Sequence, residues 1–270
     1  MHVIVCVKQV PSVEKVRVDP ETGRIAREEA PTMINPEDRN ALEEALRVKE
    51  KLGWKVTALS MGPPQAEEAL REALAMGADH AVLVSDPALA GSDAFVTSRV
   101  LAEAARRLQP FKLILCGSRS VDGETGMVGI QLAEELGLPQ VTWAVNLTVE
   151  GDTVTAGRWV DGWYEVVEAR LPAVVTVVGE INKPRYPTMR GIMEACRRKT
   201  VEVVTLKDLG IPPSSVGLNG SPTVVERVFQ PERRRGGIVL RGSVDELARK
   251  VAEVIAVSYT HLRAHETSLH

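Results

Sequence analysis

The chain has 270 residues with a formal net charge of −3, and 44% of its residues are hydrophobic, which is typical of a globular protein that buries a core. The balanced charge and the 4% of aromatic residues argue against a nucleic-acid-binding function, because neither a basic face nor stacking platforms are abundant. The widely spaced Cys6, Cys116 and Cys196 argue against metal sites and a disulfide framework, and they fit a reducing, cytoplasmic location.

The first 137 residues alternate short β-branched runs with amphipathic helical patterns. The opening run HVIVCVKQV lacks the basic start of a signal peptide, and no run in the chain approaches the roughly 20 apolar residues of a transmembrane helix. Asn35 and Ser92 are the expected N-caps of the first and third helices, and Gly77 is expected to end the second. Strands are predicted at 2–10, 55–62, 80–86 and 112–117, and helices at 35–53, 63–78, 92–108 and 126–137.

This alternation predicts an α/β fold with a mostly parallel, Rossmann-like sheet covered by helices on both faces. Ligands of such folds bind outside the carboxyl ends of the strands. The loops at that edge are VKQVPS, SMGPP, SDPALAGSD and GSRSVDGETG.

The second half of the chain has a different pattern. The β-rich part 141–180 is predicted to form consecutive antiparallel strands joined by tight turns, so the fold includes a small antiparallel region. Residues 1–206 are predicted to form the nucleotide-binding domain, and 207–257 an extended C-terminal arm, basic at 233–235, that ends in a helix from Ser243 to 256. Residues 258–270 are interpreted as a non-native tail.

The loop GSRSVDGETGMVG, residues 117–129, holds four glycines without matching the G-x-G-x-x-G or Walker A spacing. We expect Glu124 or Thr125 to start the next helix, so that free N–H groups from Gly123 onward form an anion site to which Arg119 adds charge. Asp122 and Glu124 are expected to accept hydrogen bonds from ribose hydroxyls or backbone amides. In the alternative reading, the glycines only turn a tight corner between strand and helix.

No catalytic side chains stand out. The chain has no G-x-S-x-G motif, His80 is interpreted as structural, and Glu43 and Glu44 are expected on a solvated helix face. These features are typical of a nucleotide-binding scaffold whose chemistry lies in a cofactor.

Several stretches together resemble the β-subunit of electron transfer flavoproteins, in register from residue 1 to about 256. The most specific of them is PRYPTMRGIMEACRRK, residues 184–199. The others are VCVKQVPS, INPEDRNALEEALRVKE, SMGPPQAEEALREALAMGAD, LILCGSRSVDGETGMVGIQLAEELGLPQVT and LPAVVTVVGEINKPRYPTMRGIMEACRRK.

The resemblance implies an adenine nucleotide α-hydrolase-like fold and an electron-carrier subunit rather than a stand-alone enzyme. Its α-subunit partner carries one FAD. In one branch of the family the β-subunit holds AMP; in the branch typical of anaerobes it holds a second FAD, which takes hydride from NADH and bifurcates the electrons. The stretches SVDGETG and RYPTMRGIMEA are similar to the bifurcating branch. The implied electron partners are acyl-CoA dehydrogenases and ferredoxin or flavodoxin.

The resemblance also assigns residues. Segment 184–199 corresponds to the loop that recognises the electron partner, with Met189 as its exposed anchor, and the β-rich middle and the 212–257 arm are expected to contact the α-subunit. Met127 stands where related sequences often have Gln. The implied cofactor-binding residues are Cys6, Asn35, Ala58, Leu59, Ser60, Met61, Gly117, Arg119, Ser120, Asp122, Gly123, Glu124 and Thr125. The implied partner-binding residues are Arg185, Tyr186, Met189, Ile192 and Met193.

Two other functions compete with this one. The first is a stand-alone, ATP-binding protein of the universal-stress type, which would show its own glycine-rich ATP loop or an S-G-G-x-D-S loop; neither is present. The second is a protein-docking module in which the glycine loop only turns the chain from strand to helix and binds no ligand.

Overall fold

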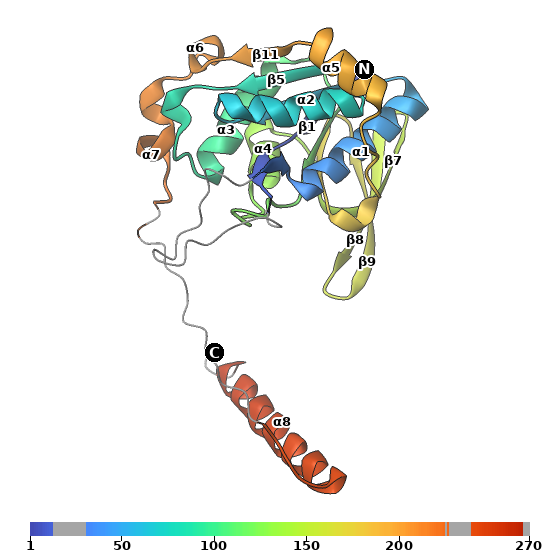
Figure 1. Cartoon of the computed structure of the whole chain (residues 1–270), viewed down its shortest axis with the longest axis vertical. Helices are drawn as coiled ribbons and strands as arrows, with labels where there is room; N and C mark the ends of the chain where they lie inside the picture. The colour runs from blue at the N-terminus through green and yellow to red at the C-terminus, as the bar shows by residue number, and fades with distance from the viewer. Residues whose placement is uncertain (13–30, 225, 227–238, 267–270) are drawn as a thin grey trace. The chain divides into compact units, whose positions relative to one another are not determined.

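The structure is a computed structural model that describes residues 1–12, 31–224, 226 and 239–266, with side chains described up to residue 257. It divides into two compact units, Met1–Glu226 and Arg227–His270. The first unit contains the sheet and most of the helices (Figure 1). The basic cluster predicted at 233–235 lies outside the described residues.

The first unit alternates strands and helices, which confirms the predicted α/β class. Its strands are β1 (His2–Cys6), β2 (Gln9–Pro11), β3 (Thr32–Ile34), β4 (Lys55–Met61), β5 (His80–Val84), β6 (Leu113–Gly117), β7 (Gln140–Glu150), β8 (Thr153–Val160), β9 (Trp163–Arg170), β10 (Ala173–Val177) and β11 (Val201–Val204). Its α-helices are α1 (Pro36–Leu52), α2 (Glu67–Met76), α3 (Ala94–Arg107), α4 (Val128–Leu136), α5 (Met189–Arg197), α6 (Leu206–Leu209) and α7 (Gly217–Gly220).

The main sheet has nine strands in the order β11-β5-β4-β1-β6-β10-β7-β8-β9. Neighbours from β11 through β7 run parallel, and β7, β8 and β9 form an antiparallel extension. The prediction of consecutive antiparallel strands over 141–180 is therefore right for β7–β9 and wrong for β10. Every residue of β10 is buried, and a strand that is apolar on both faces belongs in the interior of a parallel sheet.

The strand predicted over 2–10 is divided in two. Val7 N–H still donates to Leu59 O of β4 at 2.9 Å, but the next amide, that of Lys8, turns to a carboxylate oxygen of Asp38 at 2.8 Å. This ends the ladder, and β2 pairs antiparallel with β3 in a separate two-stranded sheet.

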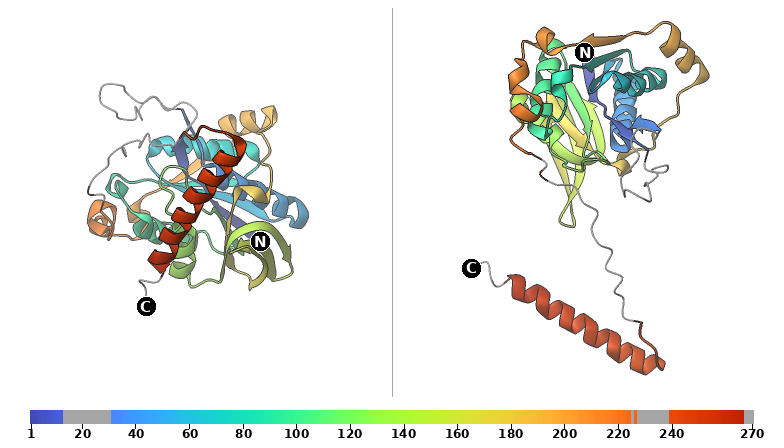
Figure 2. Two further views of the ribbon diagram at one scale, coloured as in Figure 1. Left: turned by 90° about the horizontal axis from the view of Figure 1, so that it is seen from below. Right: turned by 60° about the vertical axis from the view of Figure 1, so that its left-hand side comes forward.

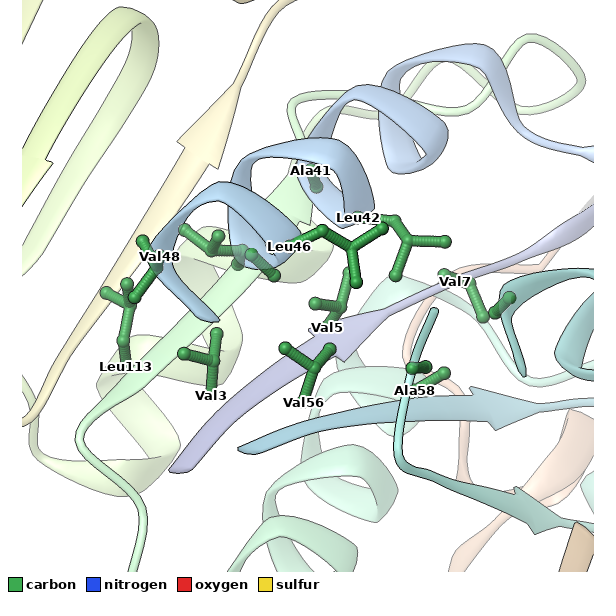
Figure 3. Close-up of a cluster of buried hydrophobic side chains, with 14 of the residues drawn as sticks. Val3, Val5, Val7, Ala41, Leu42, Leu46, Val48, Val56, Ala58 and Leu113 are labelled. Carbon is green, nitrogen blue, oxygen red and sulfur yellow. The ribbon is translucent and has the colours of Figure 1, made fainter. Parts of the chain in front are cut away.

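Helices cover both faces of the main sheet, as predicted. Figure 3 shows one face, where Leu42 and Leu46 of α1 pack onto Val3 and Val5 of β1 and Val56 of β4. The opposite face buries apolar side chains of α3 and α4 against β1, β4, β5 and β6. The two helical layers are visible on either side of the sheet in the right-hand view of Figure 2.

Two helix caps differ from the prediction. Asn35 stands at the N-cap of α1 but makes no side-chain capping bond, because its amide group binds elsewhere. Asp93, rather than Ser92, caps α3 by accepting a hydrogen bond from Val96 N at 3.0 Å. Gly77 ends α2 as predicted, with its N–H donating to a carbonyl of the last turn.

Residues 207–226 are part of the first unit. Leu206 and Val216 are buried in the core beneath α3, and Ser221 Oγ accepts a hydrogen bond from Asp93 N at 2.9 Å. The expectation that the chain is an extended arm from residue 212 is therefore wrong for residues 212–221, because Val216 is buried in this face of the core and Ser221 is bonded to the N-cap of α3.

The second unit contains the helix α8 (Val244–Glu266). Ser243 N–H donates to a carboxylate oxygen of Glu246 at 3.0 Å, so the helix begins where the sequence predicts. It continues beyond the predicted end at 256, into the segment interpreted as non-native. Across the part of the chain that the structure describes, no helix is long and apolar enough to span a membrane.

Candidate functional site

The carboxyl ends of β1 and β6 meet where the strand order of the sheet reverses. From β1 the chain moves outward to β4 and β5, and it then returns to place β6 on the other side of β1. Parallel α/β sheets bind ligands at this kind of switch point, because two neighbouring loops leave in opposite directions and open a crevice. The two loops here follow Cys6 and Gly117.

The amino end of α1 holds the first half of the glycine loop. Asn35 donates from Nδ2 to Arg119 O at 2.9 Å and accepts at Oδ1 from Val121 N at 3.1 Å. The Glu37 carboxylate accepts from Ser118 Oγ at 2.5 Å and from Arg119 N at 2.9 Å. Asn35 therefore positions the loop, which explains why it does not cap its own helix.

Asp38 ties the ends of β1 and β6 together. Its two carboxylate oxygens accept from Lys8 N at 2.8 Å and from Gly117 N at 3.1 Å. Burial raises the pKa of this carboxyl to about 7, although the hydrogen bonds it accepts act in the opposite direction. Glu37 and Asp38 were not predicted from the sequence, where their only signal is an acidic pair in the first turn of a helix.

The glycines of the loop are required for different physical reasons, except for one that packing does not require. A Cβ on Gly117 would lie 2.3 Å from Asp38 Oδ1, and one on Gly129 would lie 2.5 Å from Thr176 Cγ2, so both permit close packing. Gly126 adopts a φ of +64°, which disfavours other residues. A Cβ on Gly123 would meet nothing closer than 3.7 Å, so internal packing does not require glycine there.

The second half of the loop is exposed and leaves backbone amides free. The helix α4 begins at Val128, so the prediction that Glu124 or Thr125 starts it is wrong; Glu124 has a φ of +47°, which is not helical. Among the described residues, the N–H groups of Gly123, Thr125 and Met127 have no hydrogen-bond acceptor. Together with the first turn of α4 they form a row of donors at the sheet edge.

Lys8 crosses this edge to the exposed half of the loop. Its ammonium lies 2.7 Å from both carboxylate oxygens of Asp122 and 3.4 Å from Ser120 Oγ. Partial burial raises the pKa of Asp122, but hydrogen bonds from Lys8 and Ser120 outweigh it and hold the pKa below its usual value. Asp122 is therefore ionised at neutral pH and paired within the protein.

The other residues predicted to bind the nucleotide line the same edge. Cys6 ends β1, and Ala58–Met61 is the final part of β4. Ser60 is only 1% exposed, and its Oγ has no hydrogen-bond partner among the described residues. A buried hydroxyl without a partner is costly unless a ligand or water satisfies it.

Cys6 and Cys116 lie side by side at the ends of β1 and β6. Both are buried, as is common for free cysteine side chains. The hydrogen bond with Cys6 and burial both raise the pKa of the Cys116 thiol well above its usual value. Cys116 is thus a protonated, unreactive thiol beneath the site.

Glu43 and Glu44 do not lie on a solvated face, and the sequence prediction for them is wrong. They are 4% and 6% exposed, respectively. Arg185 donates to Glu43 from Nε at 2.8 Å, from Nη2 at 3.0 Å and from its backbone N–H at 3.0 Å. Burial raises the pKa of Glu43, but these bonds outweigh it and lower the pKa overall. Burial raises the pKa of Glu44, which accepts from Asn182.

Arg185, which is bonded to Glu43, is the first residue of an exposed apolar segment, 185–193. Met189 is 76% exposed, so it does not pack in the core, and Tyr186, Ile192 and Met193 are exposed beside it. The helix α5 packs closely on α2, since a Cβ on Gly191 would lie 2.2 Å from Ala75 O. The segment is therefore held at both ends with its apolar side chains outward.

A second exposed surface lies on the antiparallel extension, within the β-rich region that the family resemblance assigns to contact with the α-subunit, although the residues that form it were not predicted. Trp159, Trp163, Tyr164 and Val166 are exposed on β8 and β9, with the Trp159 and Tyr164 rings edge to face at 4.9 Å between centroids. We call these residues the aromatic hairpin; Figure 1 shows β8 and β9 projecting beyond the body of the sheet. Its only sequence signal is RWVDGWY, where tryptophans flank a turn. An apolar patch of this kind is typical of a protein interface.

Comparison with known proteins identifies the family. Residues 22–209 match the electron transfer flavoprotein domain. The electron transfer flavoprotein β-subunit of Thermoanaerobacterium thermosaccharolyticum is 44% identical over 253 residues, which cover 94% of this chain and 97% of that protein.

Two further relatives are named for larger assemblies. CarD, a subunit of the caffeyl-CoA reductase–Etf complex of Acetobacterium woodii, is 43% identical over 92% of this chain and 95% of that protein. The acryloyl-CoA reductase electron transfer subunit gamma of Anaerotignum propionicum is 40% identical over 94% of this chain and 98% of that protein. The chain belongs to the electron transfer flavoprotein family, which confirms the resemblance found in its sequence.

Proposed function

We propose that this chain is the nucleotide-binding β-subunit of an electron transfer flavoprotein, with the nucleotide at the switch point between β1 and β6. The observation that carries the proposal is the exposed half of the glycine loop. It offers free amide donors beside the amino end of α4, and it contains Gly123, a glycine that packing does not require. Backbone donors at a helix terminus favour phosphate.

The residues around this edge fit an adenine nucleotide. We assign the phosphates to the amides from Gly123 to Met127 and the ribose to the neighbouring loop. The adenine lies against the backbone of Cys6 and of 58–61, where Ser60 Oγ can donate its unused hydrogen bond. Asn35 and Asp38 act by holding the loop and the strand ends in place. When a flavin is bound, it supplies hydride and single-electron chemistry that no side chain here provides.

We propose FAD rather than AMP as the nucleotide, in the bifurcating branch with NADH as electron donor. The names of two relatives support this, since both belong to reductases of CoA thioesters that take an electron transfer component. Met127 lies at the N-cap of α4 and is 42% exposed. It therefore offers the nucleotide an apolar contact at a position where a polar side chain could also stand.

We assign two partner surfaces. The aromatic hairpin, together with the 207–257 region, is proposed to contact the α-subunit, because exposed tryptophan and tyrosine side chains are typical of interface cores. Segment 185–193 is proposed to contact an acyl-CoA dehydrogenase or another electron partner, with Met189 as its anchor.

Co-expression with the α-subunit tests the proposal. The purified heterodimer is denatured, and the released nucleotides are identified and counted. Two FAD per heterodimer support the bifurcating branch, and one FAD with one AMP supports the other branch. A chain that purifies alone with ATP would instead support the stand-alone, universal-stress type of function.

A further inference from the structure

Lys8 occupies a central place in the site, yet neither the sequence pattern nor the family resemblance assigns it a role. It lies two residues after the end of β1, at the switch point. Its backbone N–H is fixed by Asp38, and its ammonium reaches the exposed half of the glycine loop, where it donates to both oxygens of Asp122 at 2.7 Å. The ammonium of Lys8 is thus paired with the carboxylate of Asp122, which directly precedes the amide-bearing residues in the loop.

The two halves of the loop are held differently. Residues 117–121 are bonded to Asn35, Glu37 and Asp38 of α1 and its cap. From 122 to 126, the described hydrogen bonds that hold the loop are those of Asp122 with Lys8 and Ser120 and the bond from Glu124 N to Ser120 O. At the end of the loop, Met127 O accepts from Gln131 N of α4. The Lys8–Asp122 pair is therefore the tie between the amide-bearing half of the loop and the sheet.

We propose that Lys8 binds phosphate in this site and that Asp122 occupies its ammonium until the nucleotide enters. Binding then exchanges the Asp122 carboxylate for a phosphate group of the nucleotide, and Asp122 turns away. The inference rests on the proposed function, because it needs a nucleotide at this edge of the sheet.

Charge and exposure make this exchange feasible. The side chains of Lys8 and Asp122 are 47% and 37% exposed, so water and salt weaken their attraction and little stability is lost when they part. A phosphate offers several acceptor oxygens, and it reaches the free amides and the ammonium at once. If Asp122 stayed in place, it would repel that phosphate.

This role for Asp122 differs from the one expected from the sequence, in which it accepts hydrogen bonds from ribose hydroxyls. If Asp122 binds the ribose, it strengthens nucleotide binding, and its loss weakens the binding of every nucleoside. If Asp122 instead competes with phosphate for Lys8, it weakens nucleotide binding, and its loss strengthens the binding only of ligands that carry phosphate. The two roles therefore predict opposite signs for the same substitution.

The test compares AMP with adenosine, which differ only in the phosphate. The full chain is co-purified with its α-subunit and freed of bound nucleotide in the β-subunit, and dissociation constants are measured by calorimetry for Lys8→Gln, Asp122→Asn and the double variant. Lys8→Arg is the matched control that keeps the charge, and melting temperatures check the fold. FAD, measured in the same way, distinguishes a mononucleotide site from a dinucleotide site.

Lys8→Gln is expected to weaken AMP binding about tenfold to a hundredfold, as for the loss of a hydrogen bond between charged groups, and to leave adenosine binding unchanged. Asp122→Asn is expected to tighten AMP binding about two- to fivefold, and the gain should vanish in the double variant. AMP binding within twofold of wild type in Lys8→Gln, or equal weakening of AMP and adenosine by Asp122→Asn, overturns the exchange. If the wild type binds none of AMP, adenosine and FAD, the proposed function itself fails.

Discussion

Replacement of Arg185 by Met should destabilise the protein by leaving a buried carboxylate without its main partner. The Glu43 side chain is 6% exposed, whereas that of Arg185 is 35% exposed. Removing one member of a fully buried ion pair costs about 3–5 kcal/mol. Arg185 is partly solvated, and Arg47 remains 3.4 Å from Glu43 in the variant. We therefore expect Arg185→Met to lower the free energy of unfolding by about 2 kcal/mol.

Urea denaturation at pH 7 measures this loss as a change in the free energy of unfolding, and thermal unfolding should show a decrease of about 4–8 °C. Arg190→Met is the matched control. Arg190 pairs with Glu194 on the exposed surface of α5, and its loss should leave the unfolding midpoint unchanged. Adding Glu43→Gln to Arg185→Met should recover part of the stability, since no buried charge is then left unpaired.

The effect should depend on pH with a defined sign. The pKa of Glu43 is lowered in the folded state from its ordinary value of 4.5, so its stabilisation is complete above pH 4.5 and is lost as pH falls through the lower folded value. The difference between wild type and Arg185→Met should therefore be full at pH 7 and shrink in acid. A difference below about 0.5 kcal/mol at pH 7, or one that stays constant into acid, would refute the argument.

Four further predictions concern the site, its surfaces and the C-terminus. Gly123→Val should weaken nucleotide retention and leave the melting temperature unchanged. Gly117→Ala should lower the melting temperature, because its Cβ would lie 2.3 Å from Asp38 Oδ1. The reverse pattern would contradict both assignments. Burial raises the folded pKa of Asp38 from 3.8 to about 7. The stability of wild type relative to Asp38→Asn should therefore fall by about 4 kcal/mol as pH rises from 4 to 8. If urea titrations show the same stability difference at every pH, the raised pKa of Asp38 is wrong. Met189→Ser should leave nucleotide content and unfolding unchanged but slow electron transfer to the dehydrogenase in stopped-flow measurements, and an unchanged rate would remove its role as an anchor. Deletion of 258–270 should not lower the melting temperature, and a clear drop would show that this segment stabilises the fold.

The sequence predicted the fold class and much of the layout of the site. Alternating β-branched runs and amphipathic helices specify a parallel sheet with two helical layers, since each pattern has one way to bury its apolar side chains. Gly77 ends its helix as predicted, and Leu42 and Leu46 lie on the buried face of the first predicted helix. The glycine loop lies at the carboxyl edge of the sheet because it follows a strand, and that position can be read from local sequence.

The errors of prediction share a physical cause, which is long-range partnership. Glu43 and Glu44 have the spacing of solvated helix residues, and they are buried because Arg185 and Asn182 return to them from far along the chain. Asn35 looks like a helix cap, and its side chain instead binds the loop at 119–121. β10 follows three antiparallel strands and was grouped with them, but its burial on both faces places it inside the parallel sheet.

Local sequence determined which elements form and which loops reach the ligand edge, because periodicity and glycine act over a few residues. Only the tertiary structure decided which polar side chains meet there. The contacts of Lys8 with Asp122 and of Asp38 with Gly117 join residues that are 114 and 79 positions apart in the sequence. Such pairs depend on the strand order, which places β6 beside β1, and no short stretch of sequence contains that order.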